Sequence, residues 1–147
     1  MASSQNTETP HDFFMAMQSY WDITFKYDMA ASDDNSKCNH YFNERDNSLS
    51  KPWPKDGWCW LNPPFRKLSQ FVPKVNAEAA CGSRIVTIWP LSGDLNQIVT
   101  YQNAEVNIVH GRVWGLVRGV MLCRWGPGVF SGVYGLKWDK TRLERIW

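Results

Sequence analysis

The stretch that decides the fold is WCWLNPPFR, residues 58–66. Its first four residues form a short, continuous apolar run, which is typical of a buried strand. The run ends at Asn62, and two prolines and a phenylalanine follow. Because prolines fix φ and donate no N–H to a ladder, the strand has to end here. The stretch therefore predicts a buried strand with a stiff turn at its carboxyl end.

The residues upstream predict a helix followed by a strand. Thr9 can cap a helix that has Pro10 at its first helical position and runs to about Tyr20. Apolar and polar residues then alternate over residues 22–28, which predicts a strand that ends at Asp28. The connection to residue 58 is polar and loop-like, with room for one short helix.

The residues downstream continue this alternation of helices and strands. An apolar stripe that begins at Leu68 predicts a helix, interrupted or kinked at Pro73 and stopped by Gly82. The remaining expected elements are strands over residues 84–90 and 104–110, a helix capped by Asp94 that carries Leu95, Ile98 and Val99, and an antiparallel pair formed by residues 113–117 and 120–125 through a tight turn at Arg118 and Gly119.

This order of elements predicts an α/β protein, with a sheet covered by helices on both faces and a C-terminal β-hairpin. The 147 residues fit one domain, residues 1–147, whose Gly/Trp-rich tail, residues 126–147, has no clear pattern. In such sheets ligands bind at the carboxyl ends of strands. Asp28 and Asn62 both sit at such ends, so we expect them on one rim of the sheet, as a substrate site requires.

The charge distribution is asymmetric. Residues 1–50 carry three Lys/Arg against eight Asp/Glu, whereas residues 51–147 carry 13 against six. A basic second part suits a protein that faces an anionic partner, although scattered solvated charge is the alternative. The opening residues do not resemble a signal peptide, and no run reaches the ~20 apolar residues of a membrane span.

The four cysteines, Cys38, Cys59, Cys81 and Cys123, are widely spaced and form no C-x-x-C pair. A zinc site therefore lacks its usual signature. We interpret them as reduced thiols of a cytoplasmic protein without a membrane anchor.

The turn Asn62-Pro63-Pro64-Phe65 suits transfer of a methyl group to the exocyclic amine of adenine. The lone pair of that amine is delocalised into the ring, so acceptors on both amine hydrogens would localise and aim it. The Asn62 side-chain carbonyl and the Pro63 backbone carbonyl can be these acceptors. The prolines keep the carbonyls aimed, and Phe65 offers a flat face for a flipped-out base. Asn62 is neutral, so it positions the amine instead of acting as a base. The alternative is a plain turn after a strand.

The turn resembles the [DNS]-P-P-[FYW] motif of amino-methyltransferases that use S-adenosylmethionine. Over about residues 9–125, the chain resembles the phage-type DNA N6-adenine methyltransferases, the phage Dam family. The resemblance implies a trimmed Rossmann-like class I methyltransferase sheet, S-adenosylmethionine as cofactor, and site-specific methylation of the adenine N6 in double-stranded DNA. The segments that carry it, in order, are TPHDFF, YDMAASDDNSKCNHYF, RDNSLSKPW, WCWLNPPF and AEVNIVHGRVWG.

The resemblance also implies roles for residues, and carboxylates are natural acceptors for the ribose hydroxyls or the ammonium of such a cofactor. For Asp28 and Asp46 a capping or turn role is the alternative. The expected catalytic residues are Asn62, Pro63, Pro64 and Phe65. The expected cofactor-binding residues are Thr9, Pro10, Asp28, Ala30, Ala31, Ser32, Asp46 and Leu49, and Asn35, Lys37 and Cys38 match a further family motif. The expected nucleic-acid contacts are Arg66, Lys67, Arg112, which follows Gly111 in a family G-R pair, and Arg124; no metal site is expected.

Other functions remain open. Only about thirty residues separate the first strand from Asn62, and no target-recognition domain is recognisable, so the loop LSGDLNQ and the tail after Trp125 would supply specificity. One alternative is a catalytically silent methyltransferase-like protein that binds nucleic acid or a host protein. Another keeps the chemistry but acts on RNA or on a protein glutamine.

Overall fold

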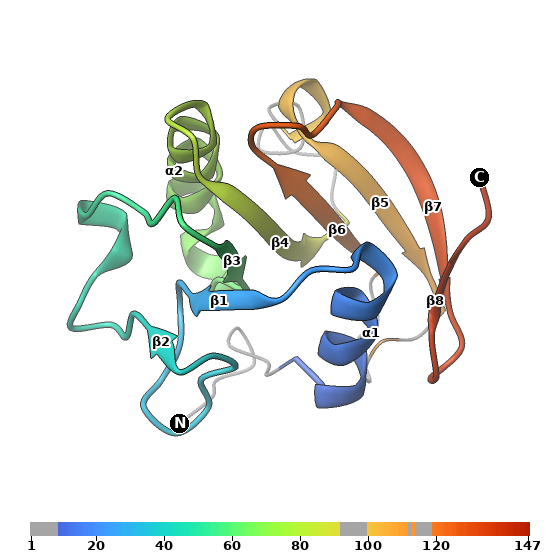
Figure 1. Cartoon of the computed structure of the whole chain (residues 1–147), viewed down its shortest axis with the longest axis horizontal. Coiled ribbons are helices and arrows are strands. Elements are labelled where there is room, and N and C mark those ends of the chain that lie inside the picture. The colour runs from blue at the N-terminus through green and yellow to red at the C-terminus, as the bar shows by residue number, and fades with distance from the viewer. Residues whose placement is uncertain (1–8, 92–99, 112, 114–118) are drawn as a thin grey trace.

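One eight-stranded sheet forms the centre of the protein, in the order β2-β1-β3-β4-β6-β5-β7-β8 (Figure 1). The computed structural model describes residues 9–91, 100–111, 113 and 119–147. Its elements are α1 (His11–Trp21), β1 (Phe25–Asp28), β2 (His40–Tyr41), the 3₁₀ turn η1 (Ser48–Ser50), β3 (Trp58–Leu61), the 3₁₀ turn η2 (Phe65–Lys67), α2 (Leu68–Ala80), β4 (Arg84–Pro90), β5 (Glu105–His110), β6 (Val120–Trp125), β7 (Gly132–Trp138) and β8 (Leu143–Arg145).

Most of the sheet is parallel. Strands β2, β1, β3 and β4 pair parallel to one another, and β5 pairs parallel to β7. Strand β6 lies between β4 and β5 and is antiparallel to both. The chain is therefore a mixed α/β protein, as the pattern predicted. The predicted strands at residues 58–61, 84–90 and 104–110 are confirmed as β3, β4 and β5, whereas the two-residue strand β2 was not predicted.

The predicted pairing of residues 113–117 with residues 120–125 is wrong. Residues 120–124 of β6 already pair with β4 on one side and with β5 on the other, so β6 offers no free edge for a hairpin partner. A C-terminal hairpin does exist, but β7 and β8 form it within the tail that had no clear pattern. Which strands pair with β6 depends on residues far apart in the sequence, so the local residue pattern cannot predict it.

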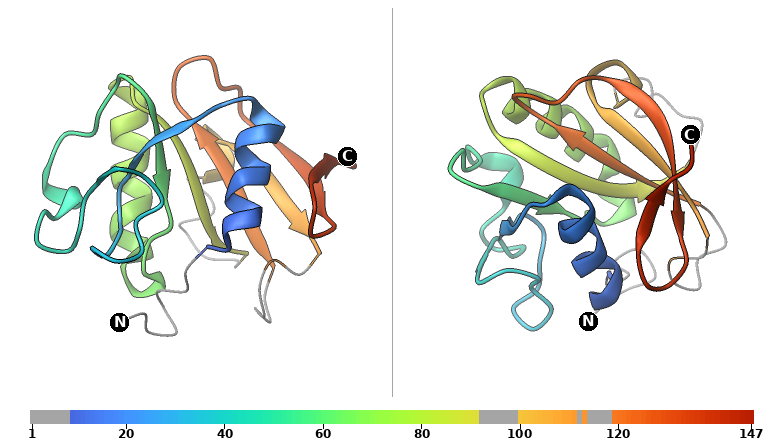
Figure 2. Two further views of the ribbon diagram at one scale, coloured as in Figure 1. Left: turned by 60° about the horizontal axis from the view of Figure 1, so that its bottom comes forward. Right: turned by 45° about the vertical axis from the view of Figure 1, so that its right-hand side comes forward.

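The apolar run of β3 is continuous because both faces of the sheet are covered. Trp60 points to the side of α1, and its ring lies 5.4 Å from that of Phe14. Cys59 and Leu61 point to the other side and join the cluster that contains the buried face of α2. Figure 2 shows the two helices on opposite sides of the sheet, which confirms that helices cover both faces.

Helix α1 begins one residue later than the cap pattern predicted. Pro10 is the N-cap, with no side-chain cap, and the helix starts at His11. Thr9, the predicted cap, is not used as one. Its hydroxyl instead accepts a hydrogen bond from Asn62, which lies 53 residues away in the sequence. A tertiary contact has replaced the local one.

Helix α2 runs without interruption from Leu68 to Ala80, through Pro73. The predicted interruption is absent; Pro73 is exposed, while Phe71, Val72 and Val75 on the other side are buried against the sheet. The predicted stop is confirmed, since Gly82 follows with φ of 110°.

Some predicted elements lie outside the described residues. The strand at residues 114–117 and most of the helix expected after Asp94 are among them, although residues 100–103 are helical. Within the part of the chain that the structure describes, neither helix is long and apolar enough to cross a membrane.

Candidate active site

The ends of β1 and β3 meet at one rim of the sheet, as predicted. Asp28 is the last residue of β1, and Asn62 directly follows β3, its parallel neighbour. The backbone N–H of Met29 donates to the Trp60 carbonyl at 2.9 Å and ties the two ends together. Strand β1 has β2 on one side and β3 on the other, so the strand order reverses here. Such a switch point is where open α/β sheets bind ligands.

A cavity of about 350 Å³ opens at this switch point. A volume of this order is typical of sites for cofactors and other small molecules. Many of the residues expected at the site line the cavity: Thr9, Asp28, Ala30, Ala31, Ser32, Asn35, Lys37, Leu49, Asn62, Pro64, Arg66 and Lys67. Pro10, Cys38, Asp46, Pro63 and Arg124 are not among its lining residues.

Asp28 organises the loop that follows it. Its carboxylate is buried, with 3% of the residue exposed, and accepts backbone N–H groups from Ala30 at 3.3 Å and Lys37 at 3.0 Å. Burial raises the pKa of Asp28, and the two N–H donors offset part of that rise. Asp28 therefore has the turn role that the sequence suggested as the alternative to cofactor binding. It also lines the cavity.

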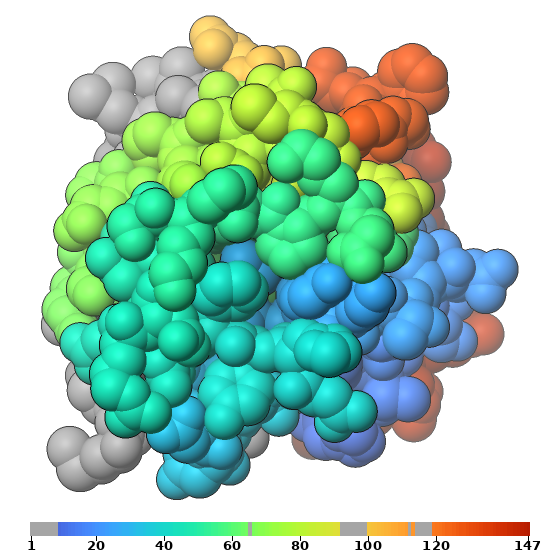
Figure 3. Space-filling model, turned by 60° about the vertical axis from the view of Figure 1, so that its left-hand side comes forward, coloured from blue at the N-terminus to red at the C-terminus, as the bar shows by residue number. Residues whose placement is uncertain are grey.

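The segment between β1 and β3 forms one wall of the cavity. The Phe42 N–H donates to the Asp28 carbonyl and the Ala31 N–H donates to the Phe42 carbonyl, both at 2.9 Å. The buried Ser48 hydroxyl donates to the Met29 carbonyl at 2.7 Å. These bonds give a long, mostly irregular segment a defined shape, and Figure 3 shows its residues, coloured teal, over a large part of one side of the molecule.

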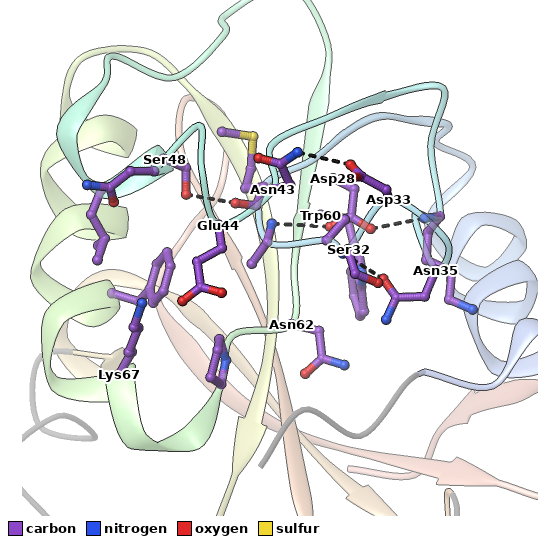
Figure 4. A pocket seen from close by; sticks show the side chains of 18 of the residues that line it. Asp28, Ser32, Asp33, Asn35, Asn43, Glu44, Ser48, Trp60, Asn62 and Lys67 are labelled. Carbon is purple, nitrogen blue, oxygen red and sulfur yellow. Dashed lines mark hydrogen bonds between the residues drawn. The ribbon is translucent and has the colours of Figure 1, made fainter. Parts of the chain in front are cut away.

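The wall contains several acidic residues, of which Asp33 and Glu44, but not Asp46, line the cavity. Asp46 closes a turn, since its carboxylate accepts the Asn43 N–H at 2.9 Å and its own N–H donates to the Asn43 side chain at 3.0 Å. Glu44 lines the cavity, and Figure 4 shows its carboxylate directed inward between Lys67 and Asn62. Glu44 was not identified from the sequence. The Asn-x-x-Asp spacing of Asn43 and Asp46 could have indicated that Asp46 closes a turn and is not turned to the cavity.

Two residues of the NPPF turn, Asn62 and Pro64, line the same cavity. Asn62 Nδ2 donates to Thr9 Oγ1 at 3.0 Å. The Pro64 carbonyl accepts the Lys67 N–H at 2.9 Å, which opens the helical stretch of η2 and α2. Within the described residues, no backbone hydrogen bond reaches the Pro63 carbonyl. The side chain of Phe65 lies outside what the structure describes.

The expected nucleic-acid contacts separate into two groups. Arg66 and Lys67 lie at the cavity, directly after the turn. Arg124 does not, because it pairs with Val86 near the amino end of β4, toward the opposite rim of the sheet. There its guanidinium holds the Glu105 carboxylate with contacts of 2.6 and 3.1 Å and covers the ring of Trp21. Arg112 lies outside the described residues.

No group of three or more His, Cys, Asp and Glu side chains suited to a metal ion occurs over residues 9–91, 100–111, 113 and 119–147. The polar groups at the cavity are instead neutral amides, hydroxyls, carboxylates and the basic residues Lys37, Arg45, Arg66 and Lys67. Such a set binds an organic, partly charged ligand by hydrogen bonds.

Fold and site together define a class: an α/β protein with a ligand cavity at the switch point of a mainly parallel sheet, bordered by an Asn-Pro-Pro-Phe turn. The family model described as DNA N-6-adenine-methyltransferase (Dam) matches residues 2–111. The chain therefore belongs to the Dam family of DNA N-6-adenine-methyltransferases, which confirms the family resemblance.

Two curated relatives carry the same description. The DNA N-6-adenine-methyltransferase of Escherichia phage T1 is 33% identical over 67 residues, 44% of this chain and 28% of the phage protein. That of Haemophilus phage HP1 (strain HP1c1) is 26% identical over 80 residues, 54% of this chain and 46% of that protein. The chain thus spans less than half the length of either relative.

Proposed function

We propose that this protein transfers the methyl group of S-adenosylmethionine to the exocyclic N6 amine of adenine in double-stranded DNA. The observation that carries the proposal is the position of Asn62, at the carboxyl end of β3 and on the same cavity as Asp28 and Glu44. Family membership supports the reaction class. The trimmed Rossmann-like sheet that we infer for it is supported by the parallel strands β2, β1, β3 and β4 and by the cavity at their switch point.

In this proposal Asn62 and Pro63 act on the adenine amine. The amide oxygen of Asn62 and the backbone carbonyl of Pro63 accept the two amine hydrogens, which localises the nitrogen lone pair. The new N–C bond forms as the C–S bond of the donor breaks, and the amine then loses a proton to solvent. Because Asn62 is neutral, it works through position and electrostatics.

The cavity has groups suited to S-adenosylmethionine, which supplies a methyl group activated by a sulfonium centre. Its volume of about 350 Å³ is within the range of small-molecule sites. The Glu44 carboxylate faces inward and can accept ribose hydroxyls or the ammonium of the cofactor (Figure 4). Asp28 holds the loop of Ala30 to Ser32 in place beside it. Glu44 thus takes the role expected of Asp46.

The DNA would approach from the side of η2. Arg66 is exposed and Lys67 half-buried, and both border the cavity directly after the catalytic turn. Cations at this place suit the phosphates that flank a base turned into the cavity. A flipped base would be read by contacts inside the cavity, so Arg66 and Lys67 would contribute affinity without sequence preference.

A methyl-transfer assay with labelled S-adenosylmethionine tests the proposal. Adenine-containing duplex DNA, RNA and a glutamine-containing protein are offered in parallel, and the labelled product is identified by mass spectrometry. We expect N6-methyladenine in the DNA alone. Asn62→Ala should lower the single-turnover rate by about 100-fold or more, as removal of a preorganised hydrogen-bonding group does.

Asn39→Ala is the matched control for that variant. Asn39 is an exposed asparagine outside the cavity lining, so its loss should leave the rate unchanged. Label in RNA or in protein would show that the substrate is RNA or a protein and not DNA. Cofactor binding without any methyl transfer would show that the protein is a catalytically inactive member of the family. Equal rates for Asn62→Ala and the unmutated protein would show that NPPF is only a turn.

A further inference from the structure

We infer that Thr9 is a positioning residue for the catalytic turn: its hydroxyl holds the Asn62 amide so that the amide oxygen faces the cavity. The inference rests on the proposed function, which gives that oxygen its purpose. Asn62 Nδ2 donates to Thr9 Oγ1 at 3.0 Å across 53 residues of sequence. The resemblance had placed Thr9 beside the cofactor, and the structure gives it a protein partner.

Thr9 is held firmly enough to do this. Only 2% of the residue is exposed, and it directly precedes Pro10, the N-cap of α1. The buried face of α1 contacts the strand that carries the turn, since the ring of Phe14 lies 5.4 Å from that of Trp60. Trp60 lies two residues before Asn62. Thr9, which precedes α1, and Asn62, which follows β3, are therefore attached to two elements that pack directly on each other.

The direction of the amide decides whether the turn can act. A side-chain amide is planar, with its oxygen and nitrogen on opposite sides, so fixing one atom fixes the other. Figure 4 shows the Asn62 oxygen on the side of Glu44 and Lys67 and the nitrogen on the side of α1. If the Asn62 amide were rotated by half a turn, its N–H groups would point at the adenine amine, which is itself a hydrogen-bond donor. The amide oxygen would then no longer be available as an acceptor.

Kinetics of Thr9 variants test the inference. Thr9→Val and Thr9→Ala should lower the single-turnover rate at saturating cofactor and DNA by ~10- to 100-fold, as small misplacements of reacting groups do. Thr9→Ser, which keeps the hydroxyl, should restore most of the rate. Calorimetry should give nearly the same cofactor affinity for all three variants, because Thr9 acts through Asn62 and not through the cofactor.

Thr87→Val is the matched control. Thr87 is also a fully buried threonine whose hydroxyl accepts a side-chain N–H, that of Trp125 at 3.1 Å, but it lies outside the cavity lining. Its loss should lower the melting temperature and leave the rate unchanged. A weaker cofactor affinity for Thr9→Val with an unchanged saturated rate would overturn the inference, since Thr9 would then be a cofactor ligand.

A second readout does not depend on activity. The side-chain NH₂ signal of Asn62, assigned in NMR spectra by its loss in Asn62→Ala, should exchange slowly with water in the unmutated protein and faster in Thr9→Val. An amide signal that does not respond to Thr9→Val overturns the inference. If the unmutated protein transfers no methyl group, the proposed function fails, while this signal still decides whether Thr9 holds Asn62.

Discussion

The Asp28 carboxylate accepts the backbone N–H of Lys37 at 3.0 Å and so closes the loop that follows β1. The same carboxylate accepts the N–H of Ala30, at 3.3 Å, so one buried side chain ties both ends of the segment. Residues of this loop line the candidate cofactor cavity. The Asp28 carboxylate is therefore one of the groups that fix the shape of the cavity wall.

Replacing Asp28 by alanine should weaken both the fold and cofactor binding. The variant leaves the N–H groups of Ala30 and Lys37 without their acceptor, and hydrogen bonds that involve a charged group contribute about 1.5–3 kcal/mol. We expect a loss of this order in the binding free energy of S-adenosylmethionine, measured by calorimetry. Asp139→Ala is the control, because Asp139 accepts the N–H groups of Thr141 and Arg142 in a turn outside the cavity lining. Equal cofactor affinity in both variants would contradict the role of Asp28.

Stability should depend on pH through Asp28. Burial raises its pKa above the ordinary value of 3.8, so the native state holds this proton more tightly than the unfolded chain. Its contribution to the free energy of unfolding is complete below pH 3.8 and is lost as the pH rises through the raised pKa. The side chain of Asp28→Asn does not titrate. Relative to this variant, the free energy of unfolding of the unmutated protein should fall by at most about 1.4 kcal/mol per pH unit above pH 4.

Urea unfolding of both proteins between pH 4 and 7 gives this difference directly. Asp139→Asn, followed from pH 4 down to pH 2, provides a control of opposite sign. Hydrogen bonds from Thr141 and Arg142 lower the pKa of Asp139 to about 2, so its contribution is present above pH 3.8 and is lost as the pH falls toward 2. Parallel stability curves for Asp28→Asn and the unmutated protein would mean that Asp28 titrates normally.

DNA affinity should depend on Arg66 and Lys67 and not on Arg124. Removing one phosphate-binding cation reduces the slope of log affinity against log salt by about 1, so Arg66→Ala and Lys67→Ala should each show this change for every sequence tested. Arg124→Ala should keep the salt slope and lower the melting temperature, because it removes the ion pair with the Glu105 carboxylate. An effect of Arg124→Ala on DNA binding would place the nucleic acid on the other rim of the sheet.

Thiol labelling should select Cys81. All four cysteines are free, but Cys81 is exposed, whereas Cys59 and Cys123 are buried. Burial raises the pKa of Cys38 and of Cys59 to about 12 and raises that of Cys123 further still, so their thiolates are scarce at neutral pH. We expect one fast equivalent with a thiol reagent in the native protein and four in denaturant. Cys81→Ser should remove the fast phase, and fast labelling that persists would contradict this assignment.

Parts of the fold could be predicted because the signals are local. The apolar runs of residues 58–61 and 84–90, and the stripe from Leu68, report burial on a strand or helix through their spacing alone. The partners of β6 could not be predicted, because the apolar run of residues 120–125 is the same whether β4 and β5 or a hairpin partner lies beside it. Strand β2 was missed because its two residues are too short to show a period.

The sequence by itself determined the NPPF turn, its place after a buried strand, and the shared rim of Asp28 and Asn62. These features depend on the chemistry of proline and on the direction of the chain, both of which follow directly from the order of the residues. Tertiary structure alone decided that Glu44 faces the cavity while Asp46 closes a turn, and that Thr9 meets Asn62. The physical reason is that a hydroxyl or a carboxylate takes whichever partner the packed elements bring within 3 Å, and that partner can lie 53 residues away in the sequence.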